Sequence, residues 1–168
     1  MTDARSPSAA FRPWPDLAVL AGFLLLCYGA AFLGQIATGP AIPTWYAGLA
    51  KPPLNPPNAV FPVVWTALYT LMAVAAWLVW QVRTAPMRGA ALAAFLVQLA
   101  LNVAWSFAFF GERSPGLGLV VVVPLLAAIA VTTWLFGRVR PLAGRLMVPY
   151  LLWVSFATYL NAGVFALN

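Results

Sequence analysis

Five long apolar stretches separated by short polar segments form the pattern of this chain. Its nine basic and three acidic residues all lie before or between these stretches. Each stretch has roughly the 20 residues that a helix needs to cross the hydrocarbon core of a bilayer. The pattern predicts an all-α integral membrane protein, a bundle of five transmembrane helices at about 17–38, 59–82, 90–110, 117–137 and 146–167. We expect residues 1–16 to form a disordered tail and 17–168 a single membrane domain.

The connection between the first two predicted helices, residues 39–58, is long, and the others are short. The stretch "LAKPPLNPPNAVFP" (49–62) holds five prolines between Lys51 and Pro62. Each proline fixes its own φ and restricts the residue before it, so the segment is stiff. Long connections in compact domains are more often functional than idle. We therefore expect this proline-rich loop to fold back over the end of the bundle as a lid.

Composition and charge support the membrane class and assign an orientation. The chain is 64% hydrophobic and 7% charged, against about 25% charged residues in soluble domains. Most basic residues lie in the N-terminal segment and in the 83–89 and 138–145 connections, whereas the other side holds Lys51 and Arg113. The positive-inside rule then predicts a cytoplasmic N-terminus. The net charge of +6 is spread over short loops, which argues against a nucleic-acid partner. The arginine-rich, proline-rich style suggests a bacterial chain.

Most catalytic chemistry is excluded by what the apolar stretches lack. They contain no acidic or basic residue, and the whole chain contains no histidine. A general base, a proton relay and a metal site all require such groups. We expect no metal, no required cofactor and no conventional catalytic residue. Cys27, the single cysteine, is interpreted as a packing residue.

What remains is a pattern of amides and aromatic residues at helical spacing. Three stripes recur at intervals of three and four residues: Phe61, Trp65, Tyr69 and Met72; Gln98, Asn102, Trp105 and Phe109; and Tyr150, Trp153, Ala157 and Asn161. A lipid-exposed amide is costly, so these stripes should face inward. The pattern predicts an uncharged, tryptophan-walled cavity beneath the proline-rich loop, suited to a flat apolar ligand. Two ordinary roles stay open, since intramembrane amides also join helices and tryptophans also form interfacial belts.

Three segments resemble the translocator protein/tryptophan-rich sensory protein (TspO/MBR) family: "WYAGLAKPPLNPPNAVFPVVWTALY" (45–69), "QLALNVAWSFAFFG" (98–111) and "VPYLLWVSFATYLNAGVF" (148–165). The resemblance implies a five-helix bundle, a homodimer and binding of porphyrins such as protoporphyrin IX. By position it implies a ligand pocket at Trp65, Asn102, Trp105 and Trp153, with Tyr69, Ala157 and Asn161 nearby. Gln98 joins these candidates from its place on the stripe. The loop signature of the family matches Trp45, Tyr46, Lys51, Pro52, Pro56 and Pro57.

Several positions depart from the pattern of the family. Leu54 and Ala59 stand where many relatives carry tryptophan, and Leu117 replaces an aromatic residue near the pocket mouth. Val97 replaces a glycine at a helix contact used for dimerisation in relatives. No basic residue follows Tyr159, so the sterol-recognition pattern of animal members is incomplete.

These observations favour a membrane receptor or carrier for tetrapyrroles and other flat apolar molecules, acting in porphyrin handling or stress sensing. One alternative is a light-dependent, photo-oxidative degrader of protoporphyrin IX, in which Trp65 and Trp153 would be the reactive residues. Another is a regulatory membrane scaffold. In each case the expected partners are a flat small molecule, membrane lipid and a second copy of the chain.

Overall fold

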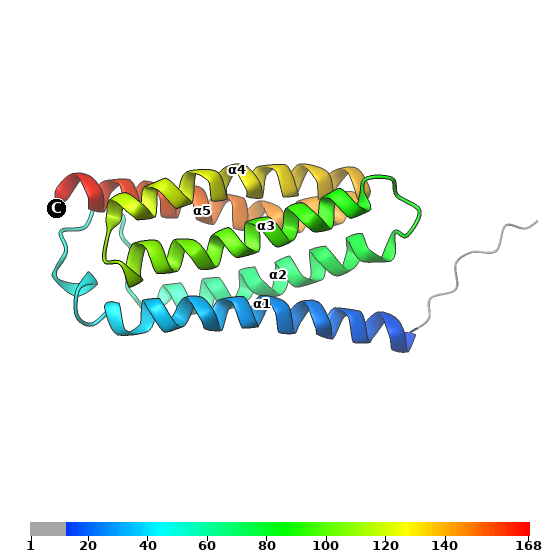
Figure 1. The fold of residues 1–168 in the computed structure, drawn as a ribbon, viewed down its shortest axis with the longest axis horizontal. Helices are drawn as coiled ribbons and strands as arrows, with labels where there is room; N and C mark the ends of the chain where they lie inside the picture. Colours follow the sequence, from blue (N-terminus) through cyan, green and yellow to red (C-terminus); the bar gives the residue numbers. More distant parts are fainter. Residues whose placement is uncertain (1–12) are drawn as a thin grey trace, which may run out of the picture.

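The computed structural model describes residues 13–168, and it is an up-and-down bundle of helices (Figure 1). The helices are α1 (Pro13–Ala41), α2 (Val60–Gln81), α3 (Arg88–Ser106), α4 (Pro115–Val139) and α5 (Pro141–Leu167). Each of the five is long and apolar enough to cross a membrane. Within residues 13–168 the predicted all-α class is therefore confirmed, with five helices that are each long and apolar enough to cross a membrane.

The long connection between α1 and α2 covers residues 42–59 and contains one short 3₁₀ turn, η1 (Tyr46–Gly48). It lies at the same end of the bundle as the C-terminus (Figure 1). The expected N-terminal tail falls mostly on residues 1–12, which lie outside the described residues. Residues 13–16, which we assigned to that tail, instead form the start of α1.

The boundary between α4 and α5 differs from the sequence-based expectation. Residues 138–145 do not form a loop, because α5 begins at Pro141 and only Arg140 separates it from α4. The extended backbone of Arg140, with φ −150° and ψ 112°, turns the chain within one residue. Pro141 takes the first turn of the helix, where its missing N–H needs no partner. Pro149, which would stand in the first turn of the predicted helix 146–167, lies inside α5.

Two glycines allow α4 and α5 to approach each other beside this corner. A Cβ atom added to Gly144 would lie 2.7 Å from the Cα and 2.8 Å from the backbone nitrogen of Gly137. The same atom would lie 3.1 Å from the carbonyl oxygen of Thr133. Because all three neighbours are backbone atoms, no side-chain movement relieves the clash. The hairpin geometry therefore requires glycine at position 144.

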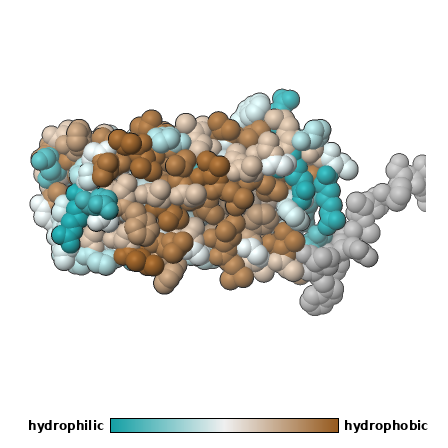
Figure 2. Space-filling model, in the orientation of Figure 1, coloured by the Kyte–Doolittle hydropathy of each residue, from teal (hydrophilic) through white to brown (hydrophobic). Residues whose placement is uncertain are grey.

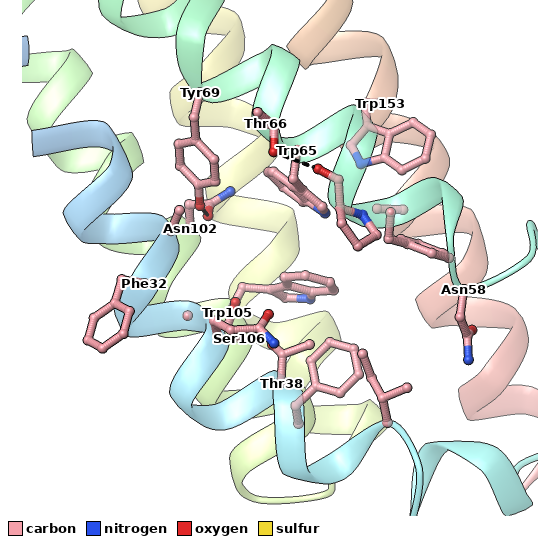
Figure 3. Close-up of a pocket in the computed structure, with 18 of the residues that line it drawn as sticks. Phe32, Thr38, Asn58, Trp65, Thr66, Tyr69, Asn102, Trp105, Ser106 and Trp153 are labelled. Atoms are coloured by element: carbon pink, nitrogen blue, oxygen red, sulfur yellow. Dashed lines mark hydrogen bonds between the residues drawn. The ribbon is translucent and has the colours of Figure 1, made fainter. Parts of the chain in front are cut away.

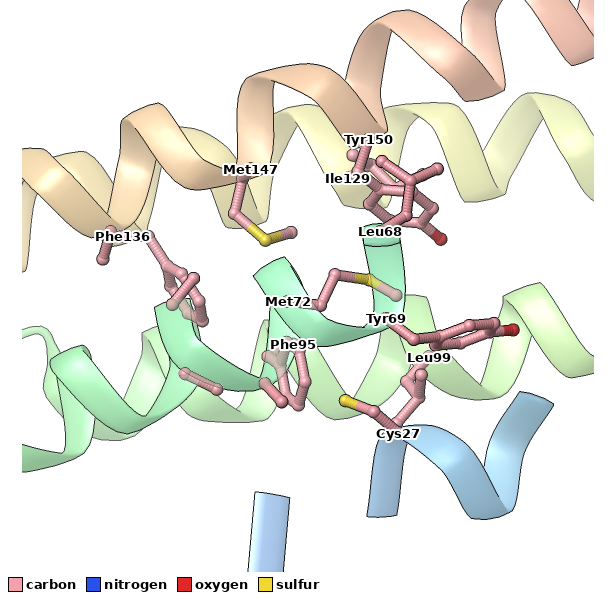
Figure 4. Packing of buried hydrophobic residues seen from close by; sticks show 14 of the residues in the cluster. Cys27, Leu68, Tyr69, Met72, Phe95, Leu99, Ile129, Phe136, Met147 and Tyr150 are labelled. Carbon is pink, nitrogen blue, oxygen red and sulfur yellow. The ribbon is translucent and has the colours of Figure 1, made fainter. Parts of the chain in front are cut away.

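The core fills the half of the bundle away from the α1–α2 connection. Phe95 of α3 stacks on Phe136 of α4, with ring centroids 5.9 Å apart, and Met72 and Met147 are fully buried alongside (Figure 4). Cys27 is 0% exposed within this cluster, which fits its interpretation as a packing residue.

The outer surface has the polarity expected of a membrane protein. Figure 2 shows hydrophobic residues over the middle of the visible face and hydrophilic residues towards its two ends. Large apolar side chains such as Leu25, Val63 and Val120 are exposed on the helices. A bilayer covers such a surface, so this exposure carries no hydrophobic penalty there.

We expect Gly144→Ala to lower the free energy of unfolding by about 1–3 kcal/mol, because the added methyl group forces the backbones of α4 and α5 apart. The matched control is Gly137→Ala, since a Cβ atom there would meet its nearest neighbour at 4.0 Å. Thermal unfolding followed by circular dichroism in detergent measures both variants. Equal transition temperatures for the two would contradict this account of the hairpin.

Candidate ligand-binding cavity beneath the α1–α2 connection

A single π-helical turn, η2 (Phe107–Gly111), follows α3 directly. The backbone N–H of Glu112 donates to the carbonyl of Phe107 at 2.8 Å, and that of Ser114 donates to Phe109 at 3.1 Å. Trp105 stacks on Phe109, with centroids 5.7 Å apart and an interplanar angle of 28°. Such turns are rare and occur frequently at functional sites. Sequence periodicity did not predict this one.

The first half of the connection packs on this turn. The rings of Trp45 and Phe109 lie 5.5 Å apart, and those of Tyr46 and Phe110 lie 5.7 Å apart. The Tyr46 hydroxyl donates to Oδ1 of Asn55 at 3.1 Å. Burial raises the pKa of Tyr46 above its usual value, so the hydroxyl keeps the proton that it donates to Asn55.

The second half of the connection is tied to the C-terminal part of α5. The backbone N–H and carbonyl of Ala50 both bond the side-chain amide of Asn168, each at 3.0 Å. The Tyr159 hydroxyl donates to the carbonyl of Pro53 at 3.1 Å. Pro52 is buried against Gly163, where an added Cβ would lie 2.5 Å from the proline ring.

A cavity of about 400 Å³ lies beneath the connection (Figure 3). Six of the eight predicted ligand-binding residues line it: Trp65, Tyr69, Asn102, Trp105, Trp153 and Ala157. They come from α2, α3 and α5, so the three predicted stripes do meet. None of the described lining residues is charged.

The wall formed by α1 was not predicted. Tyr28, Ala31, Phe32, Gln35 and Thr38 all line the cavity. The three predicted stripes lie on the second, third and fifth helices, and none lies on the first. The signal that could have found this wall is the same helical spacing, because Tyr28, Phe32 and Gln35 repeat at intervals of four and three residues.

A chain of hydrogen bonds forms the inner end of the cavity. The Tyr69 hydroxyl donates to Oδ1 of Asn102 at 2.7 Å, and Nδ2 of Asn102 donates to the Tyr150 hydroxyl at 2.9 Å. The ring of Trp65 lies between the two tyrosines, 5.6 Å from Tyr69 and 6.2 Å from Tyr150. An amide nitrogen carries two hydrogens, so Asn102 retains one donor for an occupant of the cavity.

The other two predicted residues, Gln98 and Asn161, do not line this cavity. Gln98 is fully buried, its Nε2 lies 3.9 Å from the sulfur of Met72, and its Oε1 has no hydrogen-bond partner within the described part of the chain. Asn161 accepts from the indole of Trp105 at 3.2 Å and donates to the carbonyl of Pro115 at 2.8 Å. Asn161 therefore fixes Trp105, and it also borders a smaller cavity of about 40 Å³.

The predicted loop residues do not all line the cavity. Tyr46 lines the main cavity, whereas Trp45 packs on the π-helical turn. The Lys51 ammonium lies 4.7 Å from the centre of the Tyr46 ring and donates to the carbonyl of Leu49 at 3.1 Å. Pro52 contacts α5, and Pro56 and Pro57 lie outside the residues that line the cavity.

An uncharged, aromatic cavity among membrane-spanning helices defines a class: an integral membrane protein with a small-molecule pocket within the bundle. The comparisons with known proteins narrow this class. The sequence profile of the TspO/MBR family matches residues 23–167, and the chain belongs to that family.

Curated relatives cover most of the chain. It is 41% identical to the tryptophan-rich protein TspO of Chlorobaculum tepidum, over 85% of this chain and 91% of the relative. It is 40% identical to the tryptophan-rich sensory protein of Cereibacter sphaeroides, over 91% of this chain and 93% of the relative. It is 44% identical to the human translocator protein, over 70% of each chain.

We expect Gly163→Ala to displace the connection from α5, because the added methyl group would overlap the ring of Pro52. Amide hydrogen exchange at Ala50 should then accelerate about three- to tenfold, the factor that follows from losing a typical hydrogen bond. Gly48→Ala is the matched control, since a Cβ atom at Gly48 meets nothing within 4 Å. Unchanged exchange at Ala50 in Gly163→Ala would show that this contact does not hold the connection.

Proposed function

We propose that this protein binds tetrapyrroles such as protoporphyrin IX, and other flat apolar molecules, in the cavity beneath the connection. It would act as a membrane receptor or carrier in porphyrin handling or stress sensing. The observation that carries the proposal is the meeting of Trp65, Trp105 and Trp153 around one uncharged cavity (Figure 3). Flat indole walls favour a flat, apolar occupant through offset stacking and burial of area.

The size and polarity of the cavity support this assignment. Its volume of about 400 Å³ falls in the range of roughly 300–1,000 Å³ that is typical of small-molecule sites. A porphyrin with carboxylate side chains also needs polar surroundings at one edge. Thr38 and Asn58 line the cavity near the connection, so we place the carboxylates there and the macrocycle among the tryptophans.

Two donor groups on residues that line the cavity add a preference for acceptors. Asn102 retains one N–H, and the indole nitrogen of Trp153 is buried with no partner among the described residues. A buried donor without an acceptor costs free energy. A ligand that offers an acceptor to either group is therefore favoured over a pure hydrocarbon.

Relatives carry names that agree with sensing or translocation, namely tryptophan-rich sensory protein and translocator protein. A second function, light-dependent degradation of the porphyrin, is favoured by one observation. Trp65 and Trp153 line the same cavity, so two oxidisable side chains would flank a photoexcited occupant. Light separates the two functions, because degradation requires illumination and binding does not.

The test is titration of the purified protein with protoporphyrin IX in the dark, followed by tryptophan quenching, and then illumination of the same sample. We expect saturable quenching, and an affinity about two- to tenfold lower in Trp153→Phe, the range for loss of one aromatic stacking contact. Trp134→Phe is the matched control, because Trp134 on α4 is 58% exposed and lies outside the cavity. Absence of saturable quenching would overturn the proposed function.

Illumination decides between the two functions. A porphyrin spectrum that stays constant in light supports the receptor or carrier. Loss of the porphyrin bands in light, prevented by Trp153→Phe but not by Trp134→Phe, supports degradation instead.

A further inference from the structure

The cavity is open on the side between α1 and α2. Phe32 of α1 lines the cavity and is nevertheless 68% exposed, and Tyr28 lines it at 41% exposure. Gln35, one turn further along α1, also lines the cavity and is exposed. On the facing helix the same is true of Pro62 and Thr66. Residues that belong at once to the cavity wall and to the outer surface mark an opening.

The opposite walls are closed. Tyr69, Asn102 and Ser106 line the cavity from α2 and α3 and are all buried. The connection covers the end of the cavity and is tied to Asn168 through the two hydrogen bonds of Ala50. One of its residues, Asn58, lines the cavity and is exposed, whereas the other five exposed residues of the wall lie on α1 and α2.

The two edges of this opening are matching helical stripes. Tyr28, Phe32 and Gln35 follow one face of α1, and Pro62, Thr66 and Thr70 follow one face of α2 at four-residue intervals. The helices run antiparallel, and the hydroxyls of Tyr28 and Thr70 lie 2.7 Å apart in a hydrogen bond. This bond joins the edges at the inner end of the opening, which we call the α1–α2 slot.

The slot faces hydrocarbon rather than water. At about 1.5 Å per residue, Thr66 lies about 9 Å inside the start of α2, and Phe32 lies about 14 Å from the end of α1. Leu33, Ile36 and Val63 beside the slot are apolar and exposed. Such side chains belong in contact with acyl chains. A molecule that reaches the slot must therefore come from within the bilayer.

We propose that the α1–α2 slot is the entrance of the cavity for apolar molecules dissolved in the bilayer, and that the Tyr28–Thr70 hydrogen bond restrains its opening. α1 is the least buried of the five helices, since 17% of its most apolar segment is buried, against 28% to 44% in the other four. The Gln35 amide at the mouth offers a hydrogen bond to an arriving molecule. This inference rests on one part of the proposed function, namely that the cavity binds an apolar molecule, and it does not require that molecule to be a tetrapyrrole.

The experiment uses no tetrapyrrole, so its failure is distinguishable from failure of the proposed function. A reporter thiol is placed on the α5 wall by Ala157→Cys, in a chain whose buried native thiol is removed by Cys27→Ala. The reconstituted protein is exposed to an N-alkylmaleimide that partitions into the bilayer, or to a charged maleimide that stays in water. Leu33→Cys, exposed on the outer face of α1, calibrates the reactivity of the lipid-soluble reagent.

We expect the lipid-soluble reagent to label the cavity thiol and the charged reagent to label it far more slowly. Tyr28→Phe removes the hydroxyl at the slot and should raise the rate for the lipid-soluble reagent about two- to tenfold, the factor for one net hydrogen bond. Thr70→Val should do the same, and the two together should add little more, since both remove one bond. The rate for the charged reagent should not change.

Tyr159→Phe is the matched control, because it removes the same hydroxyl from a tyrosine that bonds the connection at Pro53. It should leave both labelling rates unchanged. Faster labelling in Tyr159→Phe but not in Tyr28→Phe, or equal labelling by the two reagents, would overturn the proposal and assign entry to the connection. If Ala157→Cys does not fold, Thr38→Cys on the α1 wall of the cavity replaces it as reporter, with the same outcomes.

Discussion

The bundle depends on the hydrogen bonds that run from Tyr69 through Asn102 to Tyr150. In the interior of a membrane, water does not replace a lost partner, so each polar group must be satisfied by the protein. One asparagine satisfies two tyrosine hydroxyls from different helices and so sets the spacing of α2, α3 and α5. That spacing leaves room for Trp65 against both tyrosine rings. The shape of the cavity follows from how its inner end is hydrogen-bonded.

The opposite end is held by a different kind of contact. The π-helical turn after α3 presents Phe109 and Phe110 to the connection, and Trp45 and Tyr46 pack on them edge to face or tilted. Asn161 holds the indole of Trp105, which stacks on Phe109. These side chains are ordered by one another rather than by an occupant. The cavity is therefore largely formed before anything binds in it, which reduces the entropy lost on binding.

The sequence predicted the parts of this structure that repeat at a regular period. Apolar runs located the five helices, and helical spacing brought Trp65, Asn102 and Trp153 to one cavity. Gln98 shared that spacing but lies deeper, beside Met72, because periodicity assigns a face and not a depth.

Features that depend on tertiary contact were missed. The start of α5 was misplaced because the approach of Gly144 to Gly137 leaves no trace in hydropathy. The π-helical turn at Phe107–Gly111 escaped for a similar reason, since its sequence reads as ordinary apolar helix. Phe32 was missed because a side chain facing lipid and a side chain at a cavity mouth are equally apolar.

Because the mouth of the cavity lies on the side of the bundle, the affinity of this protein for a ligand compares the cavity with the bilayer and not with water. Lipid tails are as apolar as the cavity wall, so transfer from bilayer to cavity gains little from the hydrophobic effect. Selectivity must then arise from ring stacking, shape and the few hydrogen-bond donors inside. Phe32 at the mouth is exposed on a face that we assign to the bilayer, so the competitor for the site would be an acyl chain and not water. Occupancy is accordingly governed by the mole fraction of ligand in the membrane, and the same total amount of ligand gives a lower occupancy when more lipid is present.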